Sequence, residues 1–365
     1  MKSTICDPMK AFRASIALLV LFVGASLQAK PAKKQSNDPE FNFENLWQTF
    51  NKRYAFFELR GVDWQRQYKI FRPKVTKETT DKELFEIFCA MLAPLKDGHV
   101  NLKAKGVDGF KGKYNPEDTP DFYKEFSSDR SVKELFALSE NNLEQKGFGP
   151  AKDDTTLFRH AKSKKLGYLR VLEFEGLSRK KADAALNRIM NAFDGLDGLI
   201  VDIRDNPGGT DAMVYQIAGR FVDKERVGHH RRTKTGPGEE DFSEVKTRML
   251  KPLGKKQFTK PVVLLTNDTS FSAADVFSMV MKELPHVHVI GDHTNGIFSN
   301  MFEAKLPNGW KYTFSFQRYY SADMVCFEAK GIPVHQEVLN RKGDLKKRVD
   351  PVIQAALEHL GKHTK

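Results

Sequence analysis

Cysteine is scarce in this sequence, and long apolar runs are almost absent. Only Cys6, Cys89 and Cys326 occur among 365 residues, which excludes a small scaffold held together by several disulfides. Cys6 lies in a segment that we expect to be removed, and the sequence leaves open whether the other two pair. No apolar run after residue 29 is long enough to cross a bilayer, so we expect no membrane-spanning helix in the mature chain.

Clusters of metal-binding or nucleic-acid-binding side chains are also missing. His286 and His288 share one face of an expected strand, but no carboxylate or cysteine cluster accompanies them, so we predict no metal site. Lysine and arginine (59 residues) outnumber aspartate and glutamate (47), which gives a formal net charge of +12. These basic residues are scattered and form no stripe, so we do not predict nucleic-acid binding. A basic surface could instead attract acidic cell-envelope material or a peptide carboxylate.

The first 29 residues have the pattern of a secretory leader. Lys2, Lys10 and Arg13 precede an apolar stretch at 14–24, and small residues up to Ala29 offer a cleavage site. We therefore predict secretion across the inner membrane, to the periplasm or the cell exterior. An uncleaved N-terminal anchor is the alternative.

The remainder of the chain divides by composition and periodicity into five segments. Residues 30–40 are polar and are predicted to be a disordered linker. Residues 41–102 are predicted to form an N-terminal helical domain, residues 103–165 a connecting or lid segment, residues 166–357 an α/β domain and residues 358–365 a basic tail. Apolar residues at helical spacing define the helical domain: Phe43, Leu46, Trp47, Phe50, Tyr54, Trp64, Tyr68, Phe71, Leu84, Phe88, Met91, Leu92 and Leu95. Thr80 begins a capping box for the last of these helices.

Strand and helix patterns alternate in the second half of the chain. Strands are expected at 168–172, 199–203, 262–265 and 287–290, and helices at 178–193, 211–221 and 273–284, followed by a hairpin at 301–316. Alternation of this kind is typical of a mainly parallel sheet covered by helices. The predicted fold class is therefore α/β with an additional helical domain.

One stretch of this region, TNDTSFSAADVF at 266–277, allows two interpretations. Ser272 and Asp275 fit a capping box at the start of a helix, which explains the serine as a structural residue. The N–H groups and dipole of a helix N-terminus also stabilise negative charge, so the same position suits a nucleophilic serine. The two interpretations do not exclude each other.

Three other stretches bear on this choice. Gly208 and Gly209 follow a strand in DIRDNPGGT (202–210), where paired glycines can expose backbone N–H groups to a ligand. His99 lies in LKDGHVNL (95–102), and Glu328 lies in CFEAKGIPVH (326–335). Each stretch alone is explained as an ordinary turn.

Taken together and in this order, the motifs resemble the C-terminal-processing (tail-specific) serine peptidase family, in the branch that includes the tricorn core and interphotoreceptor retinoid-binding protein modules. The resemblance covers residues 41 to 338. It depends on LKDGHVNL, LGYLRV, GLIVDIRDNPGGT, VVLLTNDTSFSAADVF, VIGDHTNGIFSN, LPNGWKY and FEAKGIP. It implies a ClpP/crotonase-like α/β catalytic domain for residues 166–357.

The resemblance also implies roles for individual residues. Ser272 takes the position of the nucleophile, with backbone donors of the oxyanion hole at Ala273 and at Gly209 or Gly208. Many bacterial relatives use a lysine as the base, but Ile297 occupies that position here. The tricorn-like branch uses a histidine and a glutamate instead, which correspond to His99 and Glu328. The usual aspartate after the glutamate motif is replaced by His335.

These residues are the elements of acyl-transfer chemistry. Imidazole can accept and return the serine proton, and a carboxylate can orient the imidazole. The expected function is hydrolysis of peptide bonds in unfolded or short peptides near a free C-terminus, without a metal or cofactor. Two alternatives remain open: a lipid- or retinoid-binding protein on the same scaffold, and an esterase. If His99 cannot reach Ser272, Lys305 or Lys330 becomes the candidate base.

Overall fold

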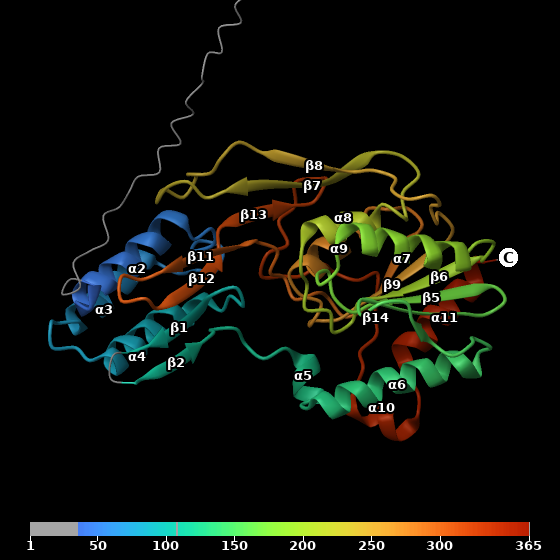
Figure 1. Ribbon diagram of the computed structural model, residues 1–365, viewed down its shortest axis with the longest axis horizontal. Coiled ribbons are helices and arrows are strands. Elements are labelled where there is room, and N and C mark those ends of the chain that lie inside the picture. Colours follow the sequence, from blue (N-terminus) through green and yellow to red (C-terminus); the bar gives the residue numbers. More distant parts are fainter. Residues whose placement is uncertain (1–35, 107–108, 365) are drawn as a thin grey trace, which may run out of the picture.

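The computed structural model describes residues 36–106 and 109–364, which assemble into three sheets with helices packed around them (Figure 1). The largest sheet has the strand order β14-β10-β9-β6-β5-β4-β3. Its strands are β3 (Lys152–Asp153), β4 (Phe158–Lys162), β5 (Leu166–Val171), β6 (Gly198–Asp202), β9 (Val262–Thr266), β10 (Val287–Gly291) and β14 (Gln336–Glu337). The strands from β5 to β14 are parallel, and β3 and β4 continue the sheet antiparallel. The predicted α/β class is confirmed.

Helices cover both faces of this sheet because its central strands are apolar on both sides. Every residue of β6 is buried, as expected for a parallel strand between two helical layers. Leu199 and Val201 join the core on the face of α7 (Arg179–Ala192), α8 (Asp211–Ala218) and α9 (Ala273–Lys282). Ile200 points the other way, into the core shared with α6 (Asp129–Gln145) and α11 (Pro351–His363). Figure 1 shows these two layers above and below the strands.

The N-terminal helices pack on a second sheet and do not form a domain by themselves. Three helices, α2 (Pro39–Arg53), α3 (Trp64–Phe71) and α4 (Asp81–Leu92), lie against the antiparallel sheet β11 (Met301–Lys305), β12 (Lys311–Ser315), β1 (Asn101–Lys105) and β2 (Lys111–Tyr114). The hairpin β11–β12 contributes Trp310, Tyr312 and Phe314 to the shared core. The predicted boundary of 41–102 therefore needs correction, because part of this core comes from a distant segment. The capping box at Thr80 is confirmed.

Three further boundaries differ from the sequence prediction. Residues 103–165 do not form one lid. Strands β1 and β2 belong to the N-terminal unit, by which we mean α2–α4 and the sheet β11-β12-β1-β2. The remaining elements, α5 (Asp121–Glu125), α6, β3 and β4, belong to the large sheet and its helices. The predicted tail at 358–365 begins inside α11, because Leu360 is fully buried and holds that turn against the sheet. The predicted linker at 30–40 overlaps the start of α2, which Asp38 caps.

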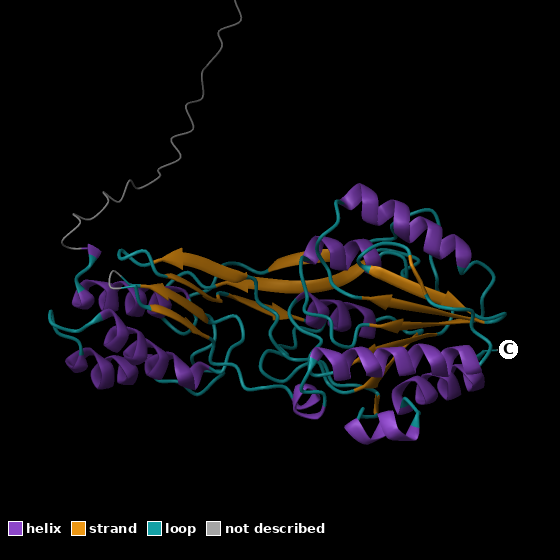
Figure 2. Ribbon diagram, turned by 60° about the horizontal axis from the view of Figure 1, so that its bottom comes forward, coloured by secondary structure: helices purple, strands orange, loops and turns teal. Residues whose placement is uncertain are grey.

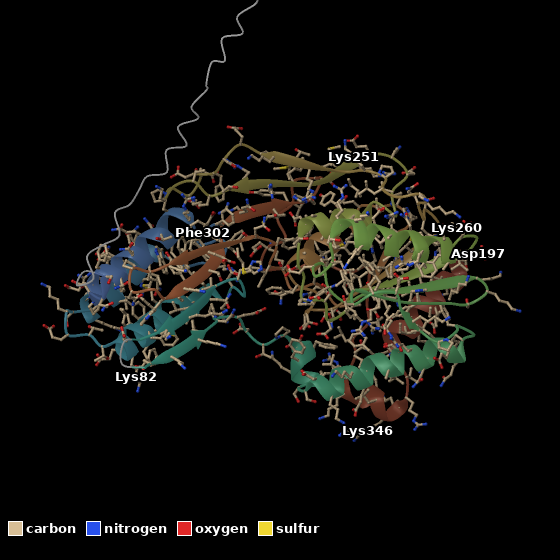
Figure 3. All side chains as sticks on the ribbon, viewed as in Figure 1. Lys82, Asp197, Lys251, Lys260, Phe302 and Lys346 are labelled. Atoms are coloured by element: carbon tan, nitrogen blue, oxygen red, sulfur yellow. The ribbon has the colours of Figure 1, made fainter. Side chains whose placement is uncertain are left out.

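A third sheet connects the two parts of the molecule. It consists of β13 (Gln317–Tyr320), β7 (Arg226–Thr233) and β8 (Lys246–Leu250), and it runs along one side of the elongated molecule (Figures 1 and 2). Figure 3 shows the two ends of the molecule. Phe302 lies in the N-terminal unit, and Lys260 and Asp197, which form an ion pair (Nζ–Oδ1, 3.5 Å), lie at the opposite end. The short helix α10 (Lys342–Lys347) lies beside α6.

Cys89 and Cys326 are both free thiols, which answers the question that the sequence left open. Within residues 36–106 and 109–364, no helix is both long and apolar enough to cross a membrane. The predicted secretory leader lies outside the described residues, so secretion stays a prediction.

Candidate active site

Ser272 occupies a strained backbone position at the start of α9. Its φ and ψ are 59° and −113°, a region that costs a non-glycine residue about 1–3 kcal/mol and is often retained for function. The preceding loop is fastened to the end of β6: Ser270 Oγ donates to Ile203 O (2.9 Å), and Phe271 N donates to Asn206 O (3.0 Å). The serine is therefore held rigidly beside the Asn206–Gly209 turn.

Asp275 fixes the other side of Ser272. Its carboxylate accepts hydrogen bonds from the N–H groups of Ser272 (2.8 Å), Gly296 (2.7 Å) and Ile297 (3.2 Å). Burial raises the pKa of Asp275 to about 7, even though these donors favour the ionised form. Ser272 is the N-cap residue of α9, as predicted, and Asp275 makes its half of the capping box, but the Ser272 side chain makes no capping hydrogen bond. The same carboxylate also holds Gly296 and Ile297, the segment for which the resemblance implied a lysine in other family members.

The glycine pair lies directly against Ser272. A Cβ on Gly208 (φ +94°) would lie 2.6 Å from Phe271 O, 2.8 Å from Ser272 Cβ and 2.9 Å from Ala273 N, so only glycine permits this close approach. Gly208 N donates to Asn206 Oδ1 (2.9 Å), which commits this N–H to the turn. Ala273 is the first residue of α9, where a backbone N–H has no acceptor within the helix. Gly209 is the other member of the pair.

His99 is buried between the N-terminal unit and the loop that carries Ser272. Its ring packs edge-to-face on Phe271, with the centroids 5.3 Å apart. Its Nδ1 lies 3.4 Å from Ser315 Oγ, which in turn donates to Asp97 Oδ1 (3.2 Å). Asp97 also accepts from the His99 backbone N–H (2.9 Å) and from Tyr54 Oη (3.0 Å). Burial lowers the pKa of His99 to about 4, so the ring is neutral at ordinary pH.

Glu328 is buried close to the same cluster but has other partners. Its Oε1 accepts from Arg60 Nη2 (3.2 Å), and its Oε2 accepts from Phe298 N (2.9 Å). Burial, followed by the negative charge of Asp97, raises the pKa of Glu328 to about 8, while Arg60 opposes the shift. Glu328 is therefore buried beside Arg60 and close to Asp97, the two residues whose charges also act on His99.

The structure brings the predicted residues into one region without joining them as a hydrogen-bonded triad. Among the hydrogen bonds of the described residues, none joins Ser272 Oγ to His99, and none joins His99 to Glu328. Lys305 and Lys330 both have exposed side chains, and neither replaces His99 in the buried cluster. The assignment of Ser272, His99 and Glu328 as a triad thus stays a prediction.

Sequence reasoning missed Asp97, Ser315 and Arg60. Asp97 lies inside the stretch LKDGHVNL, but an aspartate in a turn is ordinarily solvated. Here it is hydrogen-bonded to Tyr54 and Ser315, which come from distant segments of the chain.

Among the described residues, no group of three or more histidine, cysteine, aspartate or glutamate side chains is arranged to hold a metal ion. His288 instead stacks on His335 (centroids 4.8 Å apart) and on His359 (4.0 Å).

Comparison with known proteins identifies related chains over most of this length. Residues 165–338 match the model of peptidase family S41, and residues 35–93 match that of the tricorn protease C1 domain. The crystal structure of a candidate peptidase from Parabacteroides merdae is 30% identical, covers 88% of this chain and 96% of its own, and has a TM-score of 0.73. Mature CPAF in complex with lactacystin shares the fold, with a TM-score of 0.63 at 12% identity over 90% of this chain and 97% of its own.

Curated relatives match over shorter stretches. The carboxy-terminal processing protease CtpA of Bacillus subtilis is 25% identical over 177 residues, which are 48% of this chain and 36% of that protein. The carboxyl-terminal-processing protease of a Picosynechococcus strain is 24% identical over 203 residues, or 55% of this chain and 42% of that protein. The chain thus spans less than half the length of these two curated relatives.

Proposed function

The chain belongs to peptidase family S41, and from this premise we propose that it is an exported serine peptidase in which Ser272 attacks the peptide carbonyl. The observation that carries the proposal is the packing of Ser272 against Gly208 at the N-terminus of α9. Because Gly208 has no side chain, its turn can approach the Phe271–Ala273 backbone closely: a Cβ there would lie 2.6 Å from Phe271 O, 2.8 Å from Ser272 Cβ and 2.9 Å from Ala273 N. An oxyanion formed beside Ser272 would meet backbone N–H groups of this helix N-terminus and the positive end of its dipole.

His99 acts as the base in this proposal. Ser315 Oγ–H donates to Asp97, so Ser315 can accept a hydrogen bond from His99 Nδ1–H. This arrangement favours the tautomer with the proton on Nδ1 and leaves the lone pair of Nε2 for the serine proton. The ring and Ser272 Oγ form no hydrogen bond in the described structure, and catalytic hydrogen bonds often tighten only when substrate binds. We therefore propose that the N-terminal unit, which carries His99, moves toward α9 when substrate binds. This movement would bring the imidazole ring within hydrogen-bonding distance of Ser272 Oγ.

Glu328 supplies negative charge to the imidazolium that forms during the reaction. A buried carboxylate stabilises a nearby imidazolium, as in triads on unrelated folds. Its raised pKa means that this charge is more fully developed above about pH 8. Ala273 and Gly209 donate their N–H groups to the oxyanion, and Gly208 lets their two backbone segments approach each other closely. The substrates that we propose are unfolded or short peptides, cleaved near a free C-terminus.

Labelling with a fluorophosphonate probe tests the nucleophile directly. We expect the wild-type protein and Ser278→Ala to be labelled, and Ser272→Ala to remain unlabelled, because the probe reacts with an activated serine. Ser278 is the matched control, since it lies on the same helix, is buried and donates to Ala274 O (2.8 Å). Labelling of Ser272→Ala, or absence of labelling in folded wild type, would contradict the proposal. Labelling without hydrolysis of unfolded casein would favour an esterase.

Gly208→Ala is expected to lower kcat for peptide hydrolysis by roughly 10²- to 10³-fold, because displacing the Ala273 N–H would cost one oxyanion contact. The added methyl would lie 2.6 Å from Phe271 O, 2.8 Å from Ser272 Cβ and 2.9 Å from Ala273 N, so this backbone must move. Gly309→Ala is the matched control, because Gly309 has a similar φ of +90° but no atom within 4 Å of the added Cβ. Steady-state kinetics and thermal unfolding of both variants separate backbone strain from displacement of the oxyanion donor. Equal kcat in the two variants would disprove the assignment.

A further inference from the structure

A pocket of about 500 Å³ lies between α6 and the ends of β5 and β6, next to the Asp202–Thr210 turn. Val132 and Phe136 of α6 form one apolar wall, and Leu172 at the end of β5 forms another. Arg170, Asp205 and Tyr123 add polar atoms to the lining. Asp205 Oδ1 accepts from Tyr123 Oη (2.7 Å), so one side of the pocket is fixed by a hydrogen bond between α5 and this turn.

Arg170 is the unusual residue of this pocket. Its guanidinium stacks on Phe136, with Cζ 3.2 Å from the ring centroid. Its Nε is buried without a hydrogen-bond partner, and no ion pair or hydrogen bond of the described residues engages its side chain. Two nearby guanidiniums are neutralised: Arg204 pairs with Asp202 and Asp350, and Arg159 pairs with Glu140 and Asp153.

An arginine in this position loses hydration and gains no hydrogen-bonded acceptor. The charges of Asp202 and Asp205 attract it, but burial outweighs them and lowers the pKa of Arg170 from its ordinary value. A guanidinium that lacks hydrogen-bonded acceptors is costly when buried, and it offers a planar fork that matches a carboxylate. The Arg170 side chain lines the pocket and its Nη groups make no hydrogen bond among the described residues. An anion in the pocket could accept from them.

The surroundings favour a singly charged anion. Three carboxylates line the pocket (Asp129, Glu140 and Asp205), and Lys133 and Arg159 are its other cations, so a dianion such as phosphate would be repelled by the carboxylates more strongly than a monoanion. The apolar walls suit an aliphatic or aromatic side chain beside the carboxylate. The carboxylate of Asp205 can accept an N–H from the same ligand. A ligand with one carboxylate, an apolar side chain and an N–H donor is the C-terminal residue of a peptide chain.

The pocket also lies within reach of the nucleophile. Phe174 is the fourth residue after Arg170, a span of at most about 14 Å in an extended chain. Phe174 N donates to Gly208 O (2.6 Å), and Gly208 packs against Ser272. A peptide whose end is bound at Arg170 could therefore present a bond only a few residues upstream to Ser272.

We propose that Arg170 binds the C-terminal carboxylate of the substrate, with the last side chain packed against Phe136 and Leu172. This inference rests on the proposed peptidase function and places tail recognition in the catalytic domain itself. Asp205 then accepts the backbone N–H of the terminal residue. A free carboxyl end becomes a condition for tight binding, and an amide end lacks the charge that Arg170 requires.

Binding of a labelled hexapeptide ending in leucine, as the free acid and as the C-terminal amide, tests the proposal. In the Ser272→Ala background, which prevents turnover, we expect the acid to bind about 10- to 100-fold more tightly than the amide, as for a charged hydrogen-bonded pair. In Arg170→Met the two peptides should bind equally. Arg130→Met is the matched control, since Arg130 projects from α6 into solvent beside Glu134, and the preference should persist.

The outcome separates this site from the catalytic proposal. The proposal for Arg170 would be overturned if acid and amide bound the protein with Arg170 equally, or if neither peptide bound. It would also be overturned if the preference for the acid survived Arg170→Met. These conclusions hold whatever the result of probe labelling. Arg170→Met should unfold at an unchanged or higher temperature, because an unpaired buried cation does not stabilise the fold. If this variant does not fold, Arg170→Lys serves in its place: it keeps the charge without the fork and should retain only part of the preference.

Discussion

Replacing His99 by alanine is expected to lower kcat/KM for peptide hydrolysis by roughly 10⁴-fold or more, because the serine hydroxyl then has no base. His99 is the buried imidazole that packs on Phe271 next to the nucleophile. His160→Ala is the control, since His160 is a partly buried histidine on β4 that packs edge-to-face on Phe193. Kinetics of the two variants with an unfolded casein substrate measure the difference. Substantial activity in His99→Ala would exclude this histidine as the base.

The pH dependence of kcat/KM is an independent test of the assignment of His99 as the base. The base must be neutral, and burial lowers the pKa of His99 to about 4. The acid limb of kcat/KM that His99 causes in the free enzyme should therefore lie near pH 4 instead of the ordinary histidine value of about 6.5, whereas ionisation of Glu328 should add a separate, partial rise near pH 8. Ser315→Ala removes the contact to Nδ1 and should lower kcat more than it raises KM. An acid limb near 6.5 in the wild type would indicate a different, more exposed base.

Local patterns in the sequence were sufficient for the large sheet and for the position of Ser272. The apolar runs that became β6 and β9 are buried at every residue, and such runs are typical of parallel strands covered on both faces. The capping pattern correctly located the start of α9. Each of these features is decided by residues close together in the chain, which explains why sequence reasoning succeeded there.

Features that depend on distant contacts could not be predicted in the same way. β1 pairs with β12, so the N-terminal core contains Trp310 and Phe314 from a hairpin far along the chain. Arg170 belongs to the short strand LGYLRV, where a charged residue ordinarily faces solvent. It becomes partly buried only because α6 brings Phe136 over it. Periodicity indicates which face of an element is apolar, but it does not indicate which element covers that face.

The largest expected effect on stability comes from the buried network around Asp350. This carboxylate pairs with Arg204 (Nη1–Oδ2, 3.0 Å) and accepts from Ser139 Oγ (2.6 Å) and Asn340 Nδ2 (2.8 Å). It also caps α11 by accepting from Val352 N (3.0 Å). Asp350 thus joins the turn after β6, α6 and α11 at one point. Asp350→Ala should lower the free energy of unfolding by about 3–5 kcal/mol, because it leaves Arg204 with one buried partner fewer and α11 without its cap.

Urea unfolding of Asp350→Ala and Glu134→Ala tests this expectation, since Glu134 forms an exposed pair with Arg130 that contributes little. Burial by itself would raise the pKa of Asp350, but the charge of Arg204 and the hydrogen bonds of Ser139 and Asn340 outweigh it and hold this pKa below the ordinary value. The carboxylate therefore stabilises the fold above about pH 4, the pKa in the unfolded chain, and this contribution is lost as the pH falls further toward the folded pKa. The difference between wild type and Asp350→Ala should shrink below pH 4. A difference that is constant across this range, or smaller than that of Glu134→Ala, would show that the ion pair does not hold these elements together.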